Sequence, residues 1–228
     1  MNIEEIHYFC NDMSYQEVIA NIPDEVTLVA VSKTKSVPEI LEIYNQGQRI
    51  FGENKVQELT EKHAELPGDI QWHLIGHLQT NKVKYIASFV QMIHAVDSLK
   101  LLIEIDKQAK KHNRVIDCLL QFHIAQETSK FGLNREEAIE LIEDEAFRQL
   151  NNIRIRGVMG MATYTDNQDQ IRKEFQSLAK LFDFLKENYF FHQPSFDVKS
   201  MGMSGDFELA IESGSTLVRV GSLIFGTR

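Results

Sequence analysis

Short apolar runs rich in β-branched residues alternate with longer stretches whose apolar residues recur every three or four positions. The runs that predict strands cover residues 27–32, 48–53, 71–76, 92–97, 117–124, 156–162, 196–203 and 216–225. Helical spacing is clearest over 37–44 and along the stripe formed by Ile171, Phe175, Leu178, Phe182 and Leu185. This alternation predicts parallel strands joined by helical crossovers.

Eight strands close a (β/α)8 barrel, a fold of about 250 residues. We therefore expect the α/β class: a single TIM-type (β/α)8 barrel over residues 1–228, without a second β-domain. The last strand ends almost at residue 228, which leaves no room for a following helix. The segment up to residue 21 would supply the outer helix that closes the ring, with anchors at Tyr8, Val18, Ile19 and Ile22. The alternative is an open doubly wound sheet, but no strand–GxGxxG–helix fingerprint occurs.

Composition and charge exclude several classes of protein. The 228 residues are 43% hydrophobic and 25% charged, as in a globular protein. A net charge of −9 disfavours broad nucleic-acid binding but leaves room for a local anion site. No apolar run approaches the roughly 20 residues that span a bilayer, and the N-terminus has no signal-peptide pattern. The two cysteines form no disulfide framework. We expect a cytoplasmic monomer that binds neither nucleic acid nor membranes.

A lysine stands where the first strand ends, in the segment Ser32-Lys33-Thr34-Lys35. In a barrel, the loops that follow the strands form the functional face. Packing of the Lys33 stem against apolar neighbours would favour the neutral, nucleophilic amine that forms Schiff bases. The alternative is a solvated loop lysine beside Lys35.

Amides follow the next two strands. Asn54 and Asn81 could each hydrogen-bond a ligand, or could instead cap the helix that follows. His73, inside an apolar strand, is expected to pack in the core or in the barrel wall rather than to bind a metal. No CxxC or Asp-rich motif occurs, so we predict no metal site.

Glycines gather in the last third of the chain, where seven of the twelve lie from residue 157 onward. Barrels frequently bind phosphate with the loops after strands 7 and 8, through backbone N–H groups. Ser200, Gly221 and Ser222 offer hydroxyl donors and approachable backbone there. The alternative is that these glycines merely relieve crowding between barrel strands.

Arg219 stands between Val218 and Val220, in a stretch otherwise suited to burial. A charge there needs a carboxylate partner or a ligand. A lysine after strand 1, a phosphate cradle and an arginine on strand 8 together suggest pyridoxal 5′-phosphate (PLP), which has an aldehyde, a phosphate and a ring nitrogen.

Five segments carry a resemblance to a known family: AVSKTK (30–35), FGENKVQE (51–58), WHLIGHLQTNK (72–82), SMGMSGDFELAIESGST (200–216) and RVGSLIFGTR (219–228). With these, the chain resembles the pyridoxal-phosphate homeostasis proteins, single-domain relatives of the alanine racemase barrel (fold type III). The resemblance implies that Lys33 holds PLP as a Schiff base, that Arg219 faces the pyridine nitrogen and that Asn54 lies near the ring. It implies a phosphate site formed by Ser200, Gly221 and Ser222. Ser36 and Gly160 depart from the family pattern.

The function implied is that of a PLP carrier or regulator in vitamin B6 homeostasis, not a robust catalyst, with apo PLP-dependent enzymes as recipients. An arginine at the ring nitrogen disfavours its protonation and weakens the electron sink. The chain also stops after strand 8, where racemases add a second domain. The first alternative is a minimal fold-type III enzyme such as an amino-acid racemase, for which Tyr164 or His77 could act as acid or base. A weaker alternative is a Schiff-base aldolase acting on a phosphorylated sugar.

Overall fold

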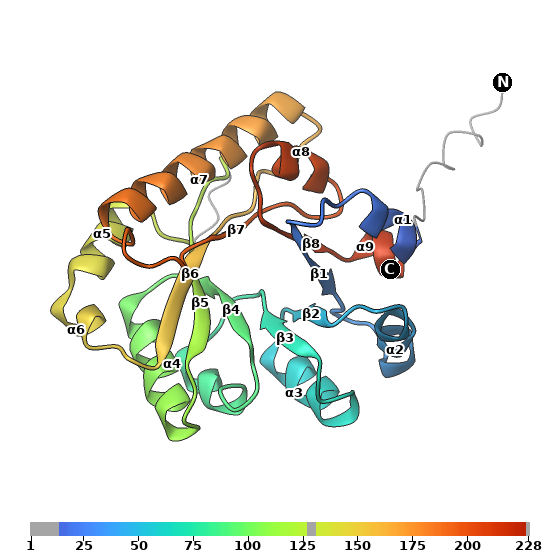
Figure 1. Cartoon of the computed structure of the whole chain (residues 1–228), viewed down its shortest axis with the longest axis horizontal. Coiled ribbons are helices and arrows are strands. Elements are labelled where there is room, and N and C mark those ends of the chain that lie inside the picture. The colour runs from blue at the N-terminus through green and yellow to red at the C-terminus, as the bar shows by residue number, and fades with distance from the viewer. Residues whose placement is uncertain (1–13, 127–130, 227–228) are drawn as a thin grey trace.

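The computed structural model describes residues 14–126 and 131–226, which fold as a barrel of parallel strands surrounded by helices (Figure 1). The strands are β1 Thr27–Val31, β2 Ile50–Glu53, β3 Gln71–Leu74, β4 Met92–Val96, β5 Ile116–Gln121, β6 Ile153–Met159, β7 Val198–Ser200 and β8 Leu217–Val220. The helices are α1 Tyr15–Ala20, α2 Val37–Asn45, α3 Val56–Glu65, the 3-10 helix η2 Thr80–Tyr85, α4 Leu99–Lys111, α5 Arg135–Glu143, α6 Glu145–Arg148, α7 Gln168–Asn188, α8 Phe207–Glu212 and α9 Ser222–Phe225.

The strands pair in chain order and the ring closes between the first and the last, which confirms the predicted (β/α)8 barrel. β1 and β8 are parallel, with Val29 opposite Arg219 and Ala30 opposite Val220. The closure therefore brings the end of β1, where Lys33 follows, beside the strand that carries Arg219.

Alternation along the strands separates two apolar layers. Residues such as Leu28 and Ala30 belong to the large core between the strands and the helices, to which α7 contributes the predicted stripe from Ile171 to Leu185. A smaller cluster, made only of strand residues, contains Val29, Met92, Ala95, Leu119, Met159, Val198 and Leu217. Because successive side chains point to opposite faces of the sheet, this second cluster fills the barrel interior.

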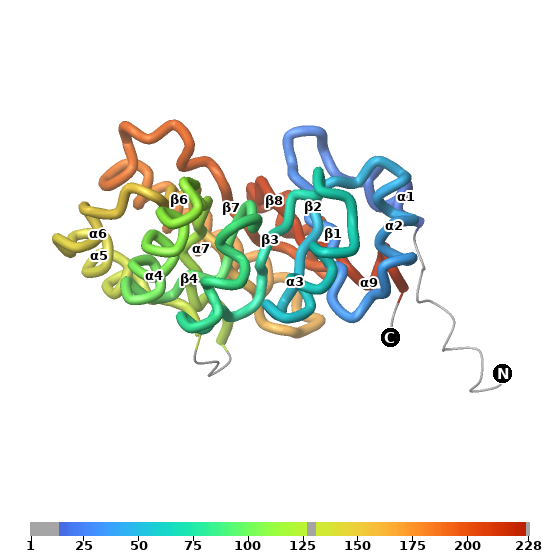
Figure 2. The backbone as a smooth tube through the Cα atoms, turned by 90° about the horizontal axis from the view of Figure 1, so that it is seen from below, coloured from blue at the N-terminus to red at the C-terminus, as the bar shows by residue number. Residues whose placement is uncertain are grey.

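Helix α1 lies beside α9 on the outside of the ring, near α2 (Figures 1 and 2). Ser14 begins it with a capping box to Glu17. Of the predicted anchors, Val18 is buried, Ile22 is partly buried and Ile19 is 39% exposed, while Tyr8 lies outside the described residues. Tyr15 is the second buried residue of the helix.

The prediction for the last strand was wrong in its length. β8 ends at Val220, and residues 222–225 form the helix α9, so a helix does follow the final strand. The short apolar run Leu223-Ile224-Phe225 fits either structure by periodicity alone, and burial of Ile224 against the outer core selected the helix.

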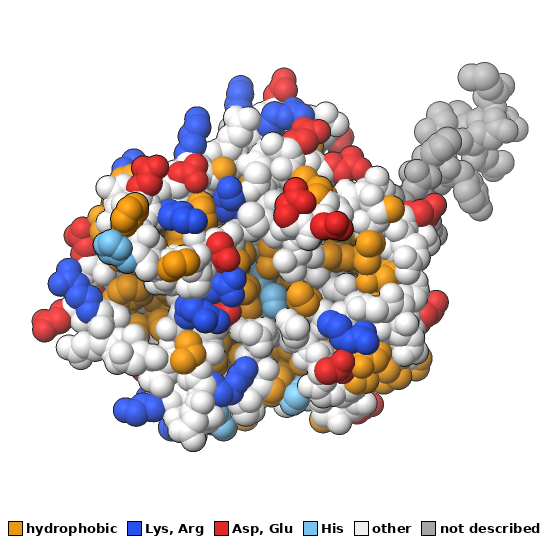
Figure 3. All heavy atoms as spheres, in the orientation of Figure 1, with side chains coloured by type: hydrophobic (Ala, Val, Ile, Leu, Met, Phe, Trp, Pro, Cys, Tyr) orange, Lys and Arg blue, Asp and Glu red, His pale blue; other side chains and the backbone are white. Residues whose placement is uncertain are grey.

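The face of the barrel shown in Figure 3 carries interspersed acidic and basic side chains rather than a continuous basic surface. Over 14–126 and 131–226, no helix is long and apolar enough to cross a membrane.

Candidate cofactor-binding site

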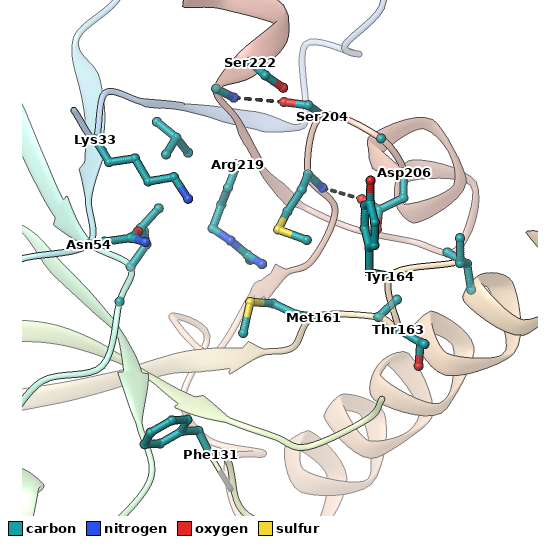
Figure 4. A pocket seen from close by; sticks show the side chains of 18 of the residues that line it. Lys33, Asn54, Phe131, Met161, Thr163, Tyr164, Ser204, Asp206, Arg219 and Ser222 are labelled. Carbon is teal, nitrogen blue, oxygen red and sulfur yellow. Dashed lines mark hydrogen bonds between the residues drawn. The ribbon is translucent and has the colours of Figure 1, made fainter. Parts of the chain in front are cut away.

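A pocket of about 1100 Å³ opens among the segments that follow β1, β2, β3, β6, β7 and β8. This is the end of a barrel at which active sites are built. Five of the six predicted site residues line it: Lys33, Asn54, Arg219, Gly221 and Ser222 (Figure 4).

The two lysines after β1 have different surroundings. Lys33 lines the pocket, and Figure 4 shows its side chain projecting into the cavity on the side of Arg219. Lys35 instead donates to the Phe225 carbonyl at 2.7 Å and lies 3.5 Å from the Glu39 carboxylate. Lys33 is exposed, so the expected burial of its stem is not observed. The pocket thus has Lys33, and not Lys35, as its amine.

A buried ion network holds the backbone on both sides of Lys33. Lys62 Nζ donates to Glu53 Oε1 at 2.8 Å, to Glu58 Oε1 at 2.7 Å and to the Ser32 carbonyl at 2.7 Å. The Thr34 N–H donates to Glu58 Oε1. Thr34 has φ of 67°, a left-handed conformation that is costly for a β-branched residue. The network therefore holds a strained turn that directs Lys33.

Glu53 is fully buried within this network. Burial raises the pKa of its carboxyl, and the hydrogen bonds from Lys62 and Ser32 oppose that rise. Oε1 accepts the Ser32 hydroxyl at 2.6 Å, whereas Oε2 has no hydrogen-bond partner among the described residues.

Arg219 is 4% exposed, yet no carboxylate within the described part of the chain pairs with it. Nη1 donates to the Ser200 carbonyl at 2.9 Å and to Ser200 Oγ at 2.6 Å, and Nη2 donates to the Gly160 carbonyl at 3.2 Å. Burial lowers its pKa to about 10, which still leaves it charged at neutral pH, and Asp206 acts in the opposite direction from a distance. A guanidinium has more N–H groups than these three bonds use, so donors remain for a ligand.

Ser200 is the predicted residue that the structure does not bring to the pocket. It is fully buried, and its hydroxyl contacts Arg219 and His94. The serine on this side of the pocket is Ser204, in the loop after β7, whose Oγ accepts the Gly221 N–H at 3.2 Å. Ser204 lies between Gly202 and Gly205, and this glycine-rich loop is the sequence feature from which Ser204 could have been predicted as a pocket residue.

Gly221 and Ser222 lie where β8 turns into α9. A Cβ atom on Gly221 would lie 3.0 Å from the Val31 carbonyl oxygen and 3.1 Å from the Val31 Cβ, which is tighter than side chains normally tolerate. Glycine thus keeps β1 and β8 close together at the pocket wall. The exposed Ser222 and the backbone of this turn offer polar groups to an anion.

Asn54 is half-buried in the pocket and does not cap α3, because the N-cap residue is Lys55 and has no side-chain cap. His73 is buried inside the barrel, as predicted. His77 and Tyr164, which the sequence offered as acid or base groups, line the pocket. Met161 also lines it and was not among the predicted site residues. The described residues contain no group of three or more His, Cys, Asp or Glu side chains arranged to hold a metal ion.

Comparison with known proteins places the chain in a family. Residues 14–228 match the model of the alanine racemase N-terminal domain. A pyridoxal phosphate homeostasis protein from Aquifex aeolicus is 42% identical over 202 residues, covering 88% of this chain and 86% of the relative. The chain belongs to the pyridoxal phosphate homeostasis proteins. The Escherichia coli family member is 38% identical over 210 residues, covering 90% of this chain and 87% of the relative.

Solved structures share the fold of this chain. PipY from Synechococcus elongatus, without PLP, has a TM-score of 0.83 and 34% identity, covering 92% of this chain and 97% of PipY. Its structure with PLP bound has a TM-score of 0.80 and 33% identity, over the same shares of the two chains. An alanine racemase from Clostridium difficile has a TM-score of 0.69 at 14% identity, covering 92% of this chain and 54% of the racemase, and shares the fold alone.

Proposed function

We propose that the chain binds PLP in this pocket with Lys33 as its covalent anchor, and that it acts as a carrier or regulator of PLP. One observation carries the proposal: a buried, charged Arg219 without a carboxylate partner in the described structure lines the same pocket as Lys33. The PLP complex of PipY, a relative with the same barrel, supports it.

The residues of the pocket fit the three functional parts of PLP. Lys33 offers the primary amine for the aldehyde, and the unused donors of Arg219 suit an unprotonated ring nitrogen. Gly221, Ser222 and Ser204 offer N–H and hydroxyl groups for the phosphate. Bound PLP supplies an electrophilic aldehyde and an electron-withdrawing ring.

Arg219 favours storage over catalysis. Its charge disfavours a proton on a ring nitrogen beside it, because like charges repel. PLP enzymes that stabilise a full carbanion usually keep that nitrogen protonated with a carboxylate. This pocket presents Arg219 instead, and the groups that Arg219 bonds to are neutral acceptors. The alternative is a minimal racemase-like enzyme. It is supported by His77 and Tyr164, which line the pocket and are residue types that can transfer protons.

The anchor is tested by the visible absorption of the purified protein with PLP, before and after borohydride reduction, with the modified peptide mapped. We expect the adduct on Lys33 and the loss of the absorption band in Lys33→Ala. Lys35→Ala is the matched control and should keep the band, because Lys35 bonds to α9. An adduct mapped mainly to Lys35 or Lys82 would contradict the assignment.

Storage and catalysis are distinguished by α-proton exchange of alanine and other amino acids in deuterated water. We expect turnover orders of magnitude below the roughly 1–10³ s⁻¹ usual for enzymes, together with release of PLP to an added apo-enzyme. Fast, saturable exchange that Lys33→Ala abolishes would favour the enzyme.

A further inference from the structure

A line of hydrogen bonds extends from Arg219 across the barrel interior. Arg219 Nη1 lies 2.6 Å from Ser200 Oγ, Ser200 Oγ lies 3.0 Å from His94 Nδ1, and His94 Nε2 lies 2.9 Å from His73 Nδ1. The four residues come from β8, β7, β4 and β3, and none is more than 4% exposed. We call Ser200, His94 and His73 the interior column.

The column has a fixed direction because a guanidinium only donates. Ser200 Oγ accepts from Arg219, and the acceptor for its own proton among the described residues is His94 Nδ1. His94 must then carry its proton on Nε2, from which it donates to His73 Nδ1. His73 in turn carries its proton on Nε2. The geometry thus specifies the same tautomer for both imidazoles.

Burial keeps both imidazoles neutral. It lowers the pKa of His73 to about 3, and the carboxylate of Asp117 opposes this only in part. Asp117 itself is bound by Arg154 at 2.7 Å and by Arg156 at 3.0 Å, so its charge is largely neutralised. The pKa of His94 is lowered well below its usual value by burial, and then by His73 and Arg219.

We propose that Ser200, His94 and His73 are positioning residues for Arg219: they hold its guanidinium by neutral, directional hydrogen bonds and leave its positive charge for the ligand. A carboxylate in place of Ser200 would pair with Arg219 and cancel that charge. The column instead fixes Nη1 from the interior, so the remaining donors of Arg219 lie toward the pocket that it lines. The role assigned to the ligand rests on the proposed function, whereas the column is a property of the protein without ligand.

The tautomers are tested on the protein without PLP, by long-range ¹H–¹⁵N correlation spectra of ¹⁵N-histidine-labelled samples at pH 7. We expect His73 and His94 to be neutral, each protonated on Nε2, with assignments from His73→Gln and His94→Gln. Ser200→Ala should shift His94 Nδ1 to the position of a nitrogen without a hydrogen bond, and Ser200→Thr should retain the shift. A cationic ring or an Nδ1–H tautomer at either histidine would overturn the inference.

The effect on the ligand is tested by the dissociation constants of PLP and of pyridoxal, which lacks the phosphate. Ser200→Ala should weaken both about tenfold, the factor expected from loosening one charge-assisted hydrogen bond. Ser200→Thr should bind both as the wild type does. Ser222→Ala, a variant of the phosphate side, should weaken PLP and leave pyridoxal unchanged.

The two ligands separate a positioning role of Ser200 from a phosphate contact. If Ser200→Ala weakens PLP but not pyridoxal, Ser200 is a phosphate ligand and the inference is overturned; it is also overturned if neither affinity changes. Failure of the wild type to bind either ligand would instead refute the proposed function, and the NMR experiment would still decide whether the column exists.

Discussion

The two sides of the pocket hold a buried cation in opposite ways. On the β1 side, Lys62 bonds to two carboxylates, those of Glu53 and Glu58, so its charge is cancelled within the protein. On the β8 side, Arg219 bonds to a hydroxyl and two carbonyl oxygens, so its charge is not cancelled. A cation that is fully paired can only support structure, whereas one solvated by neutral dipoles can still attract a ligand.

The difference matches what each side presents to the pocket. Lys62 and Glu58 hold the residues before and after Lys33 and keep the turn at Thr34. They act on the backbone, and Lys33 itself is left exposed. Arg219 itself lines the pocket, and the groups that it bonds to are neutral.

The largest effect is expected from Lys62→Met. It leaves Glu53 buried without its cation, so we expect a loss of about 3–5 kcal/mol in the free energy of unfolding, measured by urea denaturation. Lys110→Met, on the exposed side of α4, is the matched control and should change it by less than about 0.5 kcal/mol. Adding Glu53→Gln to Lys62→Met should recover part of the loss; no recovery would mean that packing of the lysine stem, and not charge pairing, dominates.

On the Arg219 side, the buried neutral histidines should make the free energy of unfolding fall in acid. His73 has a folded-state pKa of about 3, below the unfolded value, so its stabilising contribution is complete above about pH 6.5 and is lost as the pH falls toward 3. Between pH 7 and pH 4.5 we expect roughly 2–3 kcal/mol of destabilisation from His73 alone.

The measurement is urea denaturation at the two pH values for the wild type, His73→Gln and the exposed control His112→Gln. The pH dependence should be smaller in His73→Gln and unchanged in His112→Gln. Equal pH dependence in all three proteins would show that His73 accepts a proton in the folded state.

Arg219→Met should have the opposite effect to Lys62→Met: a small change in the free energy of unfolding and a large loss of PLP affinity. Removal of Arg219 leaves only neutral acceptors behind, so we expect stability within about 1 kcal/mol of the wild type. PLP affinity should fall about 10- to 100-fold, the equivalent of about 1.5–3 kcal/mol for a charge-assisted hydrogen bond. Urea denaturation and PLP titration of the same preparations check both; a large loss of stability with unchanged affinity would make Arg219 a structural cation like Lys62.

The smallest effect is expected from Glu58→Gln, because Glu58 is the partly exposed member of the ion network. The amide oxygen can still accept from Thr34 and Lys62, so we expect a loss of about 1 kcal/mol. Gln57→Glu, an exposed neighbour on α3, is the control for a change of charge. A loss as large as that of Lys62→Met would show that Glu58, and not Glu53, is the main partner of the lysine.

Much of the architecture was accessible from sequence because it depends on periodicity. The eight strands and the stripe of α7 follow from which residues must be buried, and the barrel follows from their order. The ends of elements were less accessible, as at residues 222–225, where a short apolar run suits a strand or a helix equally.

The sequence by itself determined the barrel, its family and which segments would form the pocket, because local patterning and motif order carry that information. The tertiary structure alone decided how Lys33 differs from Lys35, why Ser204 and not Ser200 reaches the pocket, and that His73 meets His94 and Ser200. These distinctions depend on which residues distant in the chain become neighbours when the ring closes, and on the direction of each side chain from its strand. Hydrogen bonds act over about 3 Å, so such contacts become definite only once the barrel is formed.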